Sequence, residues 1–268
     1  MCVLRTYVAV LASLTLVLSA FAQQPANVTT QSSPQAVSLL QKSLAALTSS
    51  QSITDLTLAG AVRRIAGSDD ESGSVVVKAV AGTGSRVDFT LPSGPRSEIR
   101  NTSSAGPAGS WTGPDGVSHA MASHNVFTDP GWSPVFTLAS LLSAPTGVVT
   151  YIGAETRDAQ SVIHISASQQ FSSMSGQPAT LWQHLTQTDV FLDASTNLPV
   201  AIAFNTHADN NALLDIPVEM RFFDYRTVSG SQIPFRVQKF LNNSLHLDLQ
   251  FQTAAVNTGL TAAQVGAQ

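Results

Sequence analysis

Cysteine is almost absent from this chain: the only one is Cys2, close to the N-terminus. Exported proteins are often held together by disulfides, but residues 23–268 cannot form one among themselves. The stability of this part of the chain must come from a hydrophobic core. A chain of this length is long enough to build one, and all-β units of this size occur as a single domain.

Basic residues are also scarce. The chain has 13 lysines and arginines against 17 acidic residues, and its only lysines are Lys42, Lys78 and Lys239. No run of basic residues occurs. The chain therefore lacks the electrostatic footprint of a protein that binds nucleic acid or an anionic lipid surface.

Catalytic and cofactor motifs are missing too. The six histidines are scattered, there is no H-E-x-x-H or G-x-S-x-G sequence, and phosphate-binding loops are absent. We therefore predict no catalytic residue, no cofactor and no metal. His207-Ala208-Asp209 offers two groups that could bind a cation, but a solvated loop is the simpler interpretation. A Ser/His/Asp triad assembled from distant residues stays open, because triads are defined by geometry.

The N-terminus has the pattern of a secretory signal. Arg5 precedes an apolar run at residues 7–20, and Ala20-Phe21-Ala22 is a small-x-small cleavage site. We predict a signal peptide over residues 1–22 and a periplasmic or secreted protein, with a membrane anchor or a buried helix as the alternatives. Cys2 precedes the apolar run, so it is not a lipid attachment site. No later apolar stretch is long enough to cross a membrane.

Two helices are expected among many strands. After a flexible segment at residues 23–33, Ser33-Pro34 is a typical helix start, followed by an apolar stripe at helical spacing. From Leu56 onward, short alternating runs separated by Gly/Ser/Asp turns predict hairpins. Residues 134–142 form a second, strongly apolar helix, and residues 189–257 are predicted to form four consecutive strands. We expect residues 34–257 to be a single domain and residues 258–268 to be a C-terminal tail.

The order of these elements defines the fold class. Helices do not alternate with strands, so a parallel α/β sheet is not expected. In residues 86–91, apolar and polar side chains alternate, as in an antiparallel strand with one wet face. We predict an α+β protein that is mainly antiparallel β.

At the level of these patterns the chain resembles the LolA/LolB-like lipoprotein-carrier superfamily of bacterial envelopes. Residues 86–89 resemble its Arg-aromatic strand, and Trp111 with Pro114-Asp115-Gly116 resembles a later hairpin. Residues 192–199 and 223–235 resemble the closing strands of its less characterised members. The resemblance implies a curved, unclosed β-barrel, or half-barrel, with the N-terminal helix and the central apolar helix on its concave side. It also implies carriage of acyl chains without cofactor or covalent chemistry.

The resemblance suggests where a ligand would bind. An apolar surface around the central helix would line a cavity in the half-barrel, although such clusters are also ordinary cores. Its candidate residues are Phe89, Trp111, Phe127, Trp132, Phe136, Leu138, Leu141 and Leu142. Arg86 is the candidate for the arginine that ties the barrel to its lid, with a solvated strand arginine as the alternative.

The sequence therefore predicts an exported, non-enzymatic protein that binds a lipid or lipoprotein acyl chain. The alternative is a non-catalytic structural or protein-interaction module, with envelope proteins as partners and the segments 169–186 and 207–215 as its working surface. An envelope hydrolase is a third reading, and it would need a clustered serine or carboxylate site.

Overall fold

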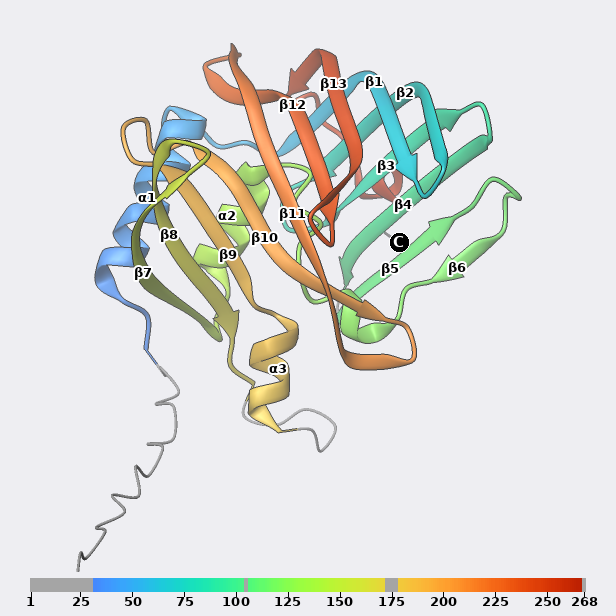
Figure 1. Ribbon diagram of the computed structural model, residues 1–268. Helices are drawn as coiled ribbons and strands as arrows, with labels where there is room; N and C mark the ends of the chain where they lie inside the picture. The colour runs from blue at the N-terminus through green and yellow to red at the C-terminus, as the bar shows by residue number, and fades with distance from the viewer. Residues whose placement is uncertain (1–30, 104–105, 172–177, 267–268) are drawn as a thin grey trace, which may run out of the picture.

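A computed structural model describes residues 31–103, 106–171 and 178–266, and the predicted signal peptide lies outside these ranges. One antiparallel sheet of 13 strands dominates it, in the order β6-β5-β4-β3-β2-β1-β13-β12-β11-β10-β9-β8-β7 (Figure 1). The strands of the first half are β1 (Asp55–Ala66), β2 (Asp69–Val80), β3 (Gly84–Leu91), β4 (Gly94–Ser103), β5 (Gly106–Thr112) and β6 (Ser118–Ala120). Those of the second half are β7 (Gly147–Arg157), β8 (Gln160–Gln169), β9 (Thr188–Asp193), β10 (Pro199–Ala208), β11 (Asn211–Val228), β12 (Ser231–Leu241) and β13 (Ser244–Val256).

The sheet is curved but not closed. Strands β6 and β7 are its two ends in the hydrogen-bonded order, and β1 and β13 pair in its middle. The described residues also form three α-helices: α1 (Pro34–Thr48), α2 (Pro134–Ser143) and α3 (Ala179–Leu185). The predicted class, an unclosed antiparallel half-barrel with helices, is confirmed. Among the described residues, no helix has the length and apolar character needed to span a bilayer.

Both predicted helices are present. Helix α1 begins at Pro34, and the side chain of Ser33 accepts a hydrogen bond from the backbone N–H of Ala36, as an N-cap does. Helix α2 extends one residue beyond its predicted end. The two helices contact each other, and α1 also lies against β7 and β12. They cover the same face of the sheet, which we call the inner face.

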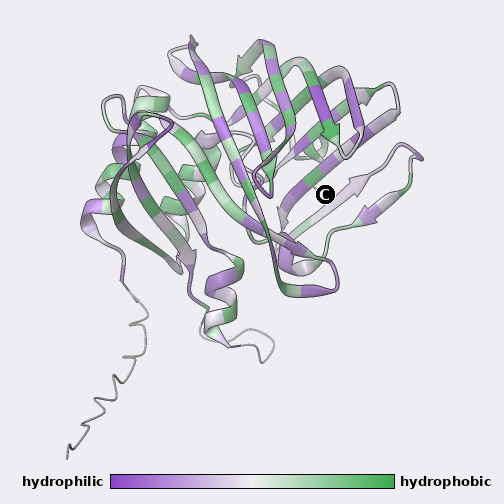
Figure 2. Ribbon diagram, viewed as in Figure 1, coloured by the Kyte–Doolittle hydropathy of each residue, from purple (hydrophilic) through white to green (hydrophobic). Residues whose placement is uncertain are grey.

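Alternation along the strands builds the core on this inner face. Val75 and Val77 of β2, Val87 of β3 and Leu249 of β13 are fully or almost fully buried, whereas their neighbours in sequence are more exposed. Figure 2 shows this alternation as bands of hydrophobic and hydrophilic residues along the ribbons. Helix α2 adds Leu138, which has no exposed surface. The core is continuous from α1 through α2 to the sheet.

The closing strands differ from the prediction in number. Residues 188–256 form five strands, β9 to β13, where we expected four. A turn through residues 194–198 separates β9 from β10, which pair with each other. The polar segment 207–215, which the interaction-module alternative took as part of its working surface, is the end of β10 and the start of β11. A two-residue turn joins them.

Most of the expected C-terminal tail is held against the sheet. The buried carboxylate of Asp55, at the start of β1, accepts hydrogen bonds from Thr258 and from the backbone N–H of Gly259. A 3-10 helix follows, η2 (Ala262–Val265), and Val265 is fully buried. This segment contacts β2, β3 and β4, so the chain remains ordered past its last strand.

Candidate functional site

A cavity of about 500 Å³ lies between α2 and the inner face of the sheet. One wall comes from the β2–β3 turn and from β4, including residues 82–85 and 100–102. The opposite wall is α2 together with the loop of residues 126–133, which we call the lid loop. Cavities of roughly 300–1,000 Å³ are typical of small-molecule sites. It is larger than two other cavities in the described part of the chain, which have volumes of about 130 and 30 Å³.

Three of the predicted ligand-binding aromatic residues line this cavity: Phe127, Trp132 and Phe136. Phe127 is itself packed against two further aromatic rings, Phe171 and Trp182, with ring centroids 6.3 and 4.9 Å away. Trp182 belongs to α3, so this short helix supports the lid loop from outside the cavity. The cluster makes the wall rigid on the α3 side, and sequence analysis had not included Phe171 or Trp182.

The other predicted site residues lie elsewhere. Leu138 is buried in the main core, Leu142 packs against it, and Leu141 lines a much smaller neighbouring cavity of about 30 Å³. Phe89 is a core residue whose ring meets Trp132 edge-on at 6.3 Å. Trp111 is 43 % exposed on β5 and stacks on His119 of the edge strand β6. Phe89 and Trp111 are not in the cavity wall.

An arginine does join the sheet to the lid loop, but it is Arg100. The Nη1 of Arg100, on β4, donates hydrogen bonds to the carbonyl oxygens of Asn125 and Thr128, at 2.6 and 3.1 Å. Arg86, predicted for this role, lies on β3 next to the inward-facing Val87. It pairs with Asp88 two residues along the strand, and both side chains are more than one-third exposed. Arg86 therefore lies on the opposite face, which we call the outer face.

Arg100 is part of a charged cluster on the inner face. Its Nε donates to Glu98 at 3.0 Å, and both side chains are largely buried. Lys239 of β12 lies over the ring of Trp132, with its Nζ 5.3 Å from the centroid. Burial lowers the pKa of Lys239, against the attraction of Glu98, which raises it. Burial alone would raise the pKa of Glu98, but the positive charges of Lys239 and Arg100 bring this pKa below its ordinary value. The cluster fixes Trp132 and the lid loop relative to β4 and β12.

Asp129 is the carboxylate of the cavity wall. It accepts hydrogen bonds from the backbone N–H of Gly131 at 2.7 Å and from the hydroxyl of Thr137 at 2.8 Å. Burial raises the pKa of Asp129, although these hydrogen bonds and Arg100 act in the opposite direction. Asp129 ties the lid loop to the first turns of α2, which makes the two a single wall.

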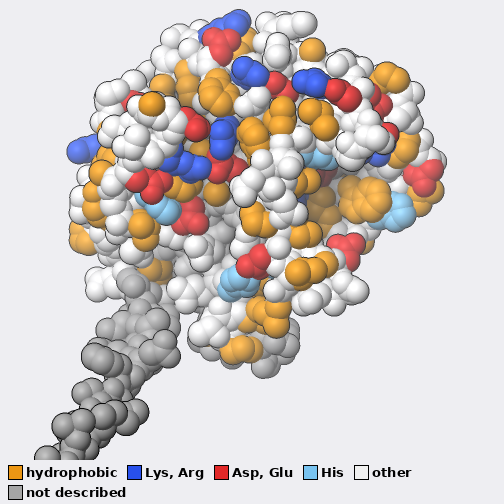
Figure 3. All heavy atoms as spheres, viewed as in Figure 1, with side chains coloured by type: hydrophobic (Ala, Val, Ile, Leu, Met, Phe, Trp, Pro, Cys, Tyr) orange, Lys and Arg blue, Asp and Glu red, His pale blue; other side chains and the backbone are white. Residues whose placement is uncertain are grey.

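The outer face of the sheet has a different character. It carries the exposed ion pair Arg63–Asp70 and the ion pair Arg236–Asp248, in which the arginine is exposed and the aspartate is largely buried. In the space-filling view, charged groups of both signs alternate over the strands β11–β13 and β1 (Figure 3). Mixed charge of this kind favours solubility and offers no single-sign surface to a nucleic acid.

Comparison with known proteins finds similarity in structure only. No family model matches the sequence, and no curated protein gives a significant match. Among solved structures, a domain from Vibrio parahaemolyticus that was proposed to be an outer membrane lipoprotein-sorting protein is 12 % identical, with a TM-score of 0.55. The match covers 87 % of this chain and 96 % of that one.

Two further structures match over a similar length. A protein of the DUF1329 family from Desulfovibrio piger is 10 % identical with a TM-score of 0.57, covering 88 % of this chain and 98 % of that one. A LolA superfamily protein from Nitrosomonas europaea is 12 % identical with a TM-score of 0.51, covering 85 % and 96 %. At these identities the similarity concerns the fold, and the chain therefore has a LolA-like fold.

Proposed function

We propose that this protein binds the acyl chain of a lipid or lipoprotein, non-covalently, in the cavity between α2 and the sheet. The observation that carries the proposal is the cavity itself. It is walled by Phe127, Trp132 and Phe136 and reaches about 500 Å³. The fold is shared with a domain proposed to sort outer membrane lipoproteins. That likeness supports the proposal without deciding it.

The energetics suit an acyl chain. Moving a methylene from water into an apolar site is favourable by about 0.8 kcal/mol, so a slot for roughly ten carbons would give useful binding without any polar contact. Polar residues also line the cavity, among them Thr83, Asn101 and Ser133. They would meet the polar end of the ligand while the aromatic wall takes its chain.

We propose binding rather than catalysis. Four serines and Asp129 line the cavity, but no histidine is among its lining residues in the described part of the chain. A serine there lacks an imidazole to accept its proton. We further propose export to the bacterial envelope, on the basis of the signal-like residues 1–22.

A cavity-filling variant tests the proposal. Ser140 lines the cavity from an exposed position on α2, so Ser140→Trp should fill it without disturbing the core. We expect at least a tenfold loss of affinity for a fluorescent fatty-acyl probe. The matched control is Ala45→Trp, which adds the same side chain to an exposed position of α1. Equal affinity of both variants, or no probe binding by the unmodified protein, would count against the proposal.

One observation favours the second candidate, a protein-interaction module. The β10–β11 hairpin exposes two adjacent leucines, Leu213 and Leu214, which are 73 % and 54 % exposed. Contiguous exposed apolar surface marks sites of protein interaction, and these two leucines would contribute to one. Replacing both with serine should abolish recovery of envelope proteins in pull-down experiments and leave acyl binding intact, if this candidate is correct.

A further inference from the structure

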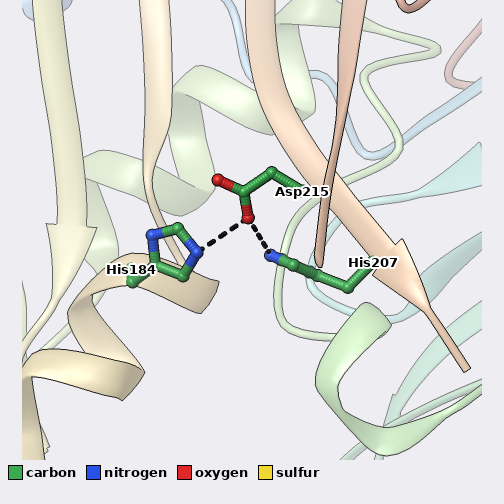
Figure 4. A group of neighbouring side chains, drawn as sticks. All are labelled: His184, His207 and Asp215. Atoms are coloured by element: carbon green, nitrogen blue, oxygen red, sulfur yellow. Dashed lines mark hydrogen bonds and ion pairs between the residues drawn. The ribbon is translucent and has the colours of Figure 1, made fainter. Parts of the chain in front are cut away.

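Three side chains from separate elements meet below the sheet. His184 is in the last turn of α3, His207 is near the end of β10, and Asp215 is in β11 (Figure 4). The Nε2 atoms of His184 and His207 lie 2.9 and 3.2 Å from the same oxygen, Asp215 Oδ1. One ligand atom from each residue lies within 4.8 Å of the other two. Figure 4 shows both rings pointing toward that oxygen.

His207 is the unusual member of this cluster. It is only 3 % exposed, and among the described residues neither of its ring nitrogens has a hydrogen-bond partner. Its Nε2 is close to Asp215 Oδ1, but the contact does not have the geometry of a hydrogen bond. Buried polar atoms are normally paired, so an unpaired nitrogen aimed at two other ligand groups indicates a missing partner.

We propose that His184, His207 and Asp215 bind a divalent transition-metal ion, with Zn²⁺ as the best match. In a tetrahedral zinc site, metal–ligand distances of about 2.0–2.2 Å place neighbouring ligand atoms ~3.4 Å apart. The observed separations of 2.9 and 3.2 Å need only a small expansion to reach this value. Three protein ligands leave the fourth position open for a water molecule.

The donor set argues against other common ions. Ca²⁺ and Mg²⁺ prefer cages of oxygen ligands, whereas two imidazoles and one carboxylate suit zinc and its neighbours. His124 stays outside the ligand set, because its Nε2 lies 3.0 Å from the carbonyl oxygen of Ala208.

The metal would fasten α3 to the β10–β11 hairpin. In the structure both histidines approach Asp215, whose side chain is partly exposed. The site is separate from the cavity and does not depend on acyl binding. It also departs from the sequence prediction of no metal, which treated His207-Ala208-Asp209 as part of a solvated loop. The structure brings His207 close to Asp215 instead.

The test is a Zn²⁺ titration of the full mature chain against a chromophoric competitor. We expect one saturable site per chain and a rise in Tm on adding Zn²⁺. His184→Gln and Asp215→Asn change partly exposed side chains, so both variants should fold, and each should weaken Zn²⁺ binding at least tenfold. His119→Gln is the matched control, because His119 lies on the edge strand β6 and is not one of the three ligands; the affinity of this variant should be unchanged.

X-ray absorption of the zinc-loaded, unmodified protein gives a second measurement that needs no variant. We expect scattering from two imidazole ligands. Three results would each overturn the proposal. They are the absence of saturable Zn²⁺ binding, an affinity of His184→Gln and Asp215→Asn equal to that of the unmodified protein, and a spectrum without imidazole scattering.

Discussion

The two faces of the sheet use the same kinds of side chain for different purposes. On the outer face, Arg86 pairs with Asp88 in contact with water. On the inner face, Arg100 pairs with Glu98 and also donates to the carbonyl oxygens of Thr128 in the lid loop and of Asn125 just before it. The difference teaches that burial and a second partner, rather than the ion pair itself, give an arginine a structural role in this fold.

The largest expected effect is a loss of stability, which should differ between a buried residue of α2 and an exposed residue of β7. Leu138 of α2 has no exposed surface, so Leu138→Ala should lower the free energy of unfolding by about 2–5 kcal/mol. Ile152 of β7 is 54 % exposed, and Ile152→Ala should change the free energy of unfolding by less than about 0.5 kcal/mol. Urea denaturation measures both. Similar losses in the two variants would remove the contrast between the faces.

The next effect compares the two arginines directly. Arg100→Ala removes three hydrogen bonds, and we expect a loss of about 1.5–3 kcal/mol, since hydrogen bonds to charged groups are strong when buried. Arg86→Ala should cost about 0–1 kcal/mol, because its pair is exposed. Limited proteolysis should cut Arg100→Ala faster near the lid loop. A larger cost at Arg86 would show that the wrong arginine has been assigned to the lid.

A smaller effect is the pH dependence of stability, which should have opposite signs for Asp129 in the cavity wall and Asp248 on the outer face. Burial raises the pKa of Asp129, so its protonated form stabilises the fold. This contribution is complete below the ordinary pKa of 3.8 and is lost as the pH rises through the folded-state value. Burial alone would raise the pKa of Asp248, but hydrogen bonds from Arg236 and Gln238 lower this pKa below its ordinary value. Its stabilisation is present above 3.8 and is lost as the pH falls through the folded-state value.

These signs can be measured with two amide variants. The measured quantity is the stability of each variant minus that of the unmodified protein at the same pH. For Asp129→Asn this difference should be more favourable at about pH 6 than at about pH 3, and for Asp248→Asn it should be less favourable at about pH 6. Urea midpoints at both pH values give the comparison. If both variants shift in the same direction, the two carboxylates do not differ in the way that their surroundings imply.

Local sequence patterns were enough to predict a mainly antiparallel β protein with two helices, whereas the half-barrel was predicted from the family resemblance. Alternation in residues 86–91 gave a strand with one buried face, and Ser33-Pro34 marked the start of α1. Both signals act over a few residues, so they survive without knowledge of distant contacts. The turn at residues 208–211 was missed because polar residues of this kind occur both in tight turns and in longer loops, so the sequence did not distinguish the two.

The site was harder to predict because its residues are far apart in sequence. Glu98 and Lys239 meet only because the sheet curves through β3, β2, β1 and β13, which lie between β4 and β12. Arg86 and Arg100 each lie two residues from a carboxylate, and only the register shows which one faces the helices. His184, His207 and Asp215 likewise have no common sequence motif. For the aromatic wall, composition was a better guide, because apolar residues concentrate in the segment 126–142.

The most direct test of the central claim uses Trp132 in the cavity wall. A Trp111→Phe, Trp182→Phe double variant leaves Trp132 as the only tryptophan of the chain. A fatty acid brominated along its chain should quench that fluorescence in a saturable manner, and the unbrominated acid should compete. Adding Ser140→Trp would introduce a new fluorophore, so Ser140→Phe is the blocking variant, and it should abolish the quenching. Unquenched Trp132 at saturating brominated acid, or quenching that persists in Ser140→Phe, would contradict acyl binding in this cavity.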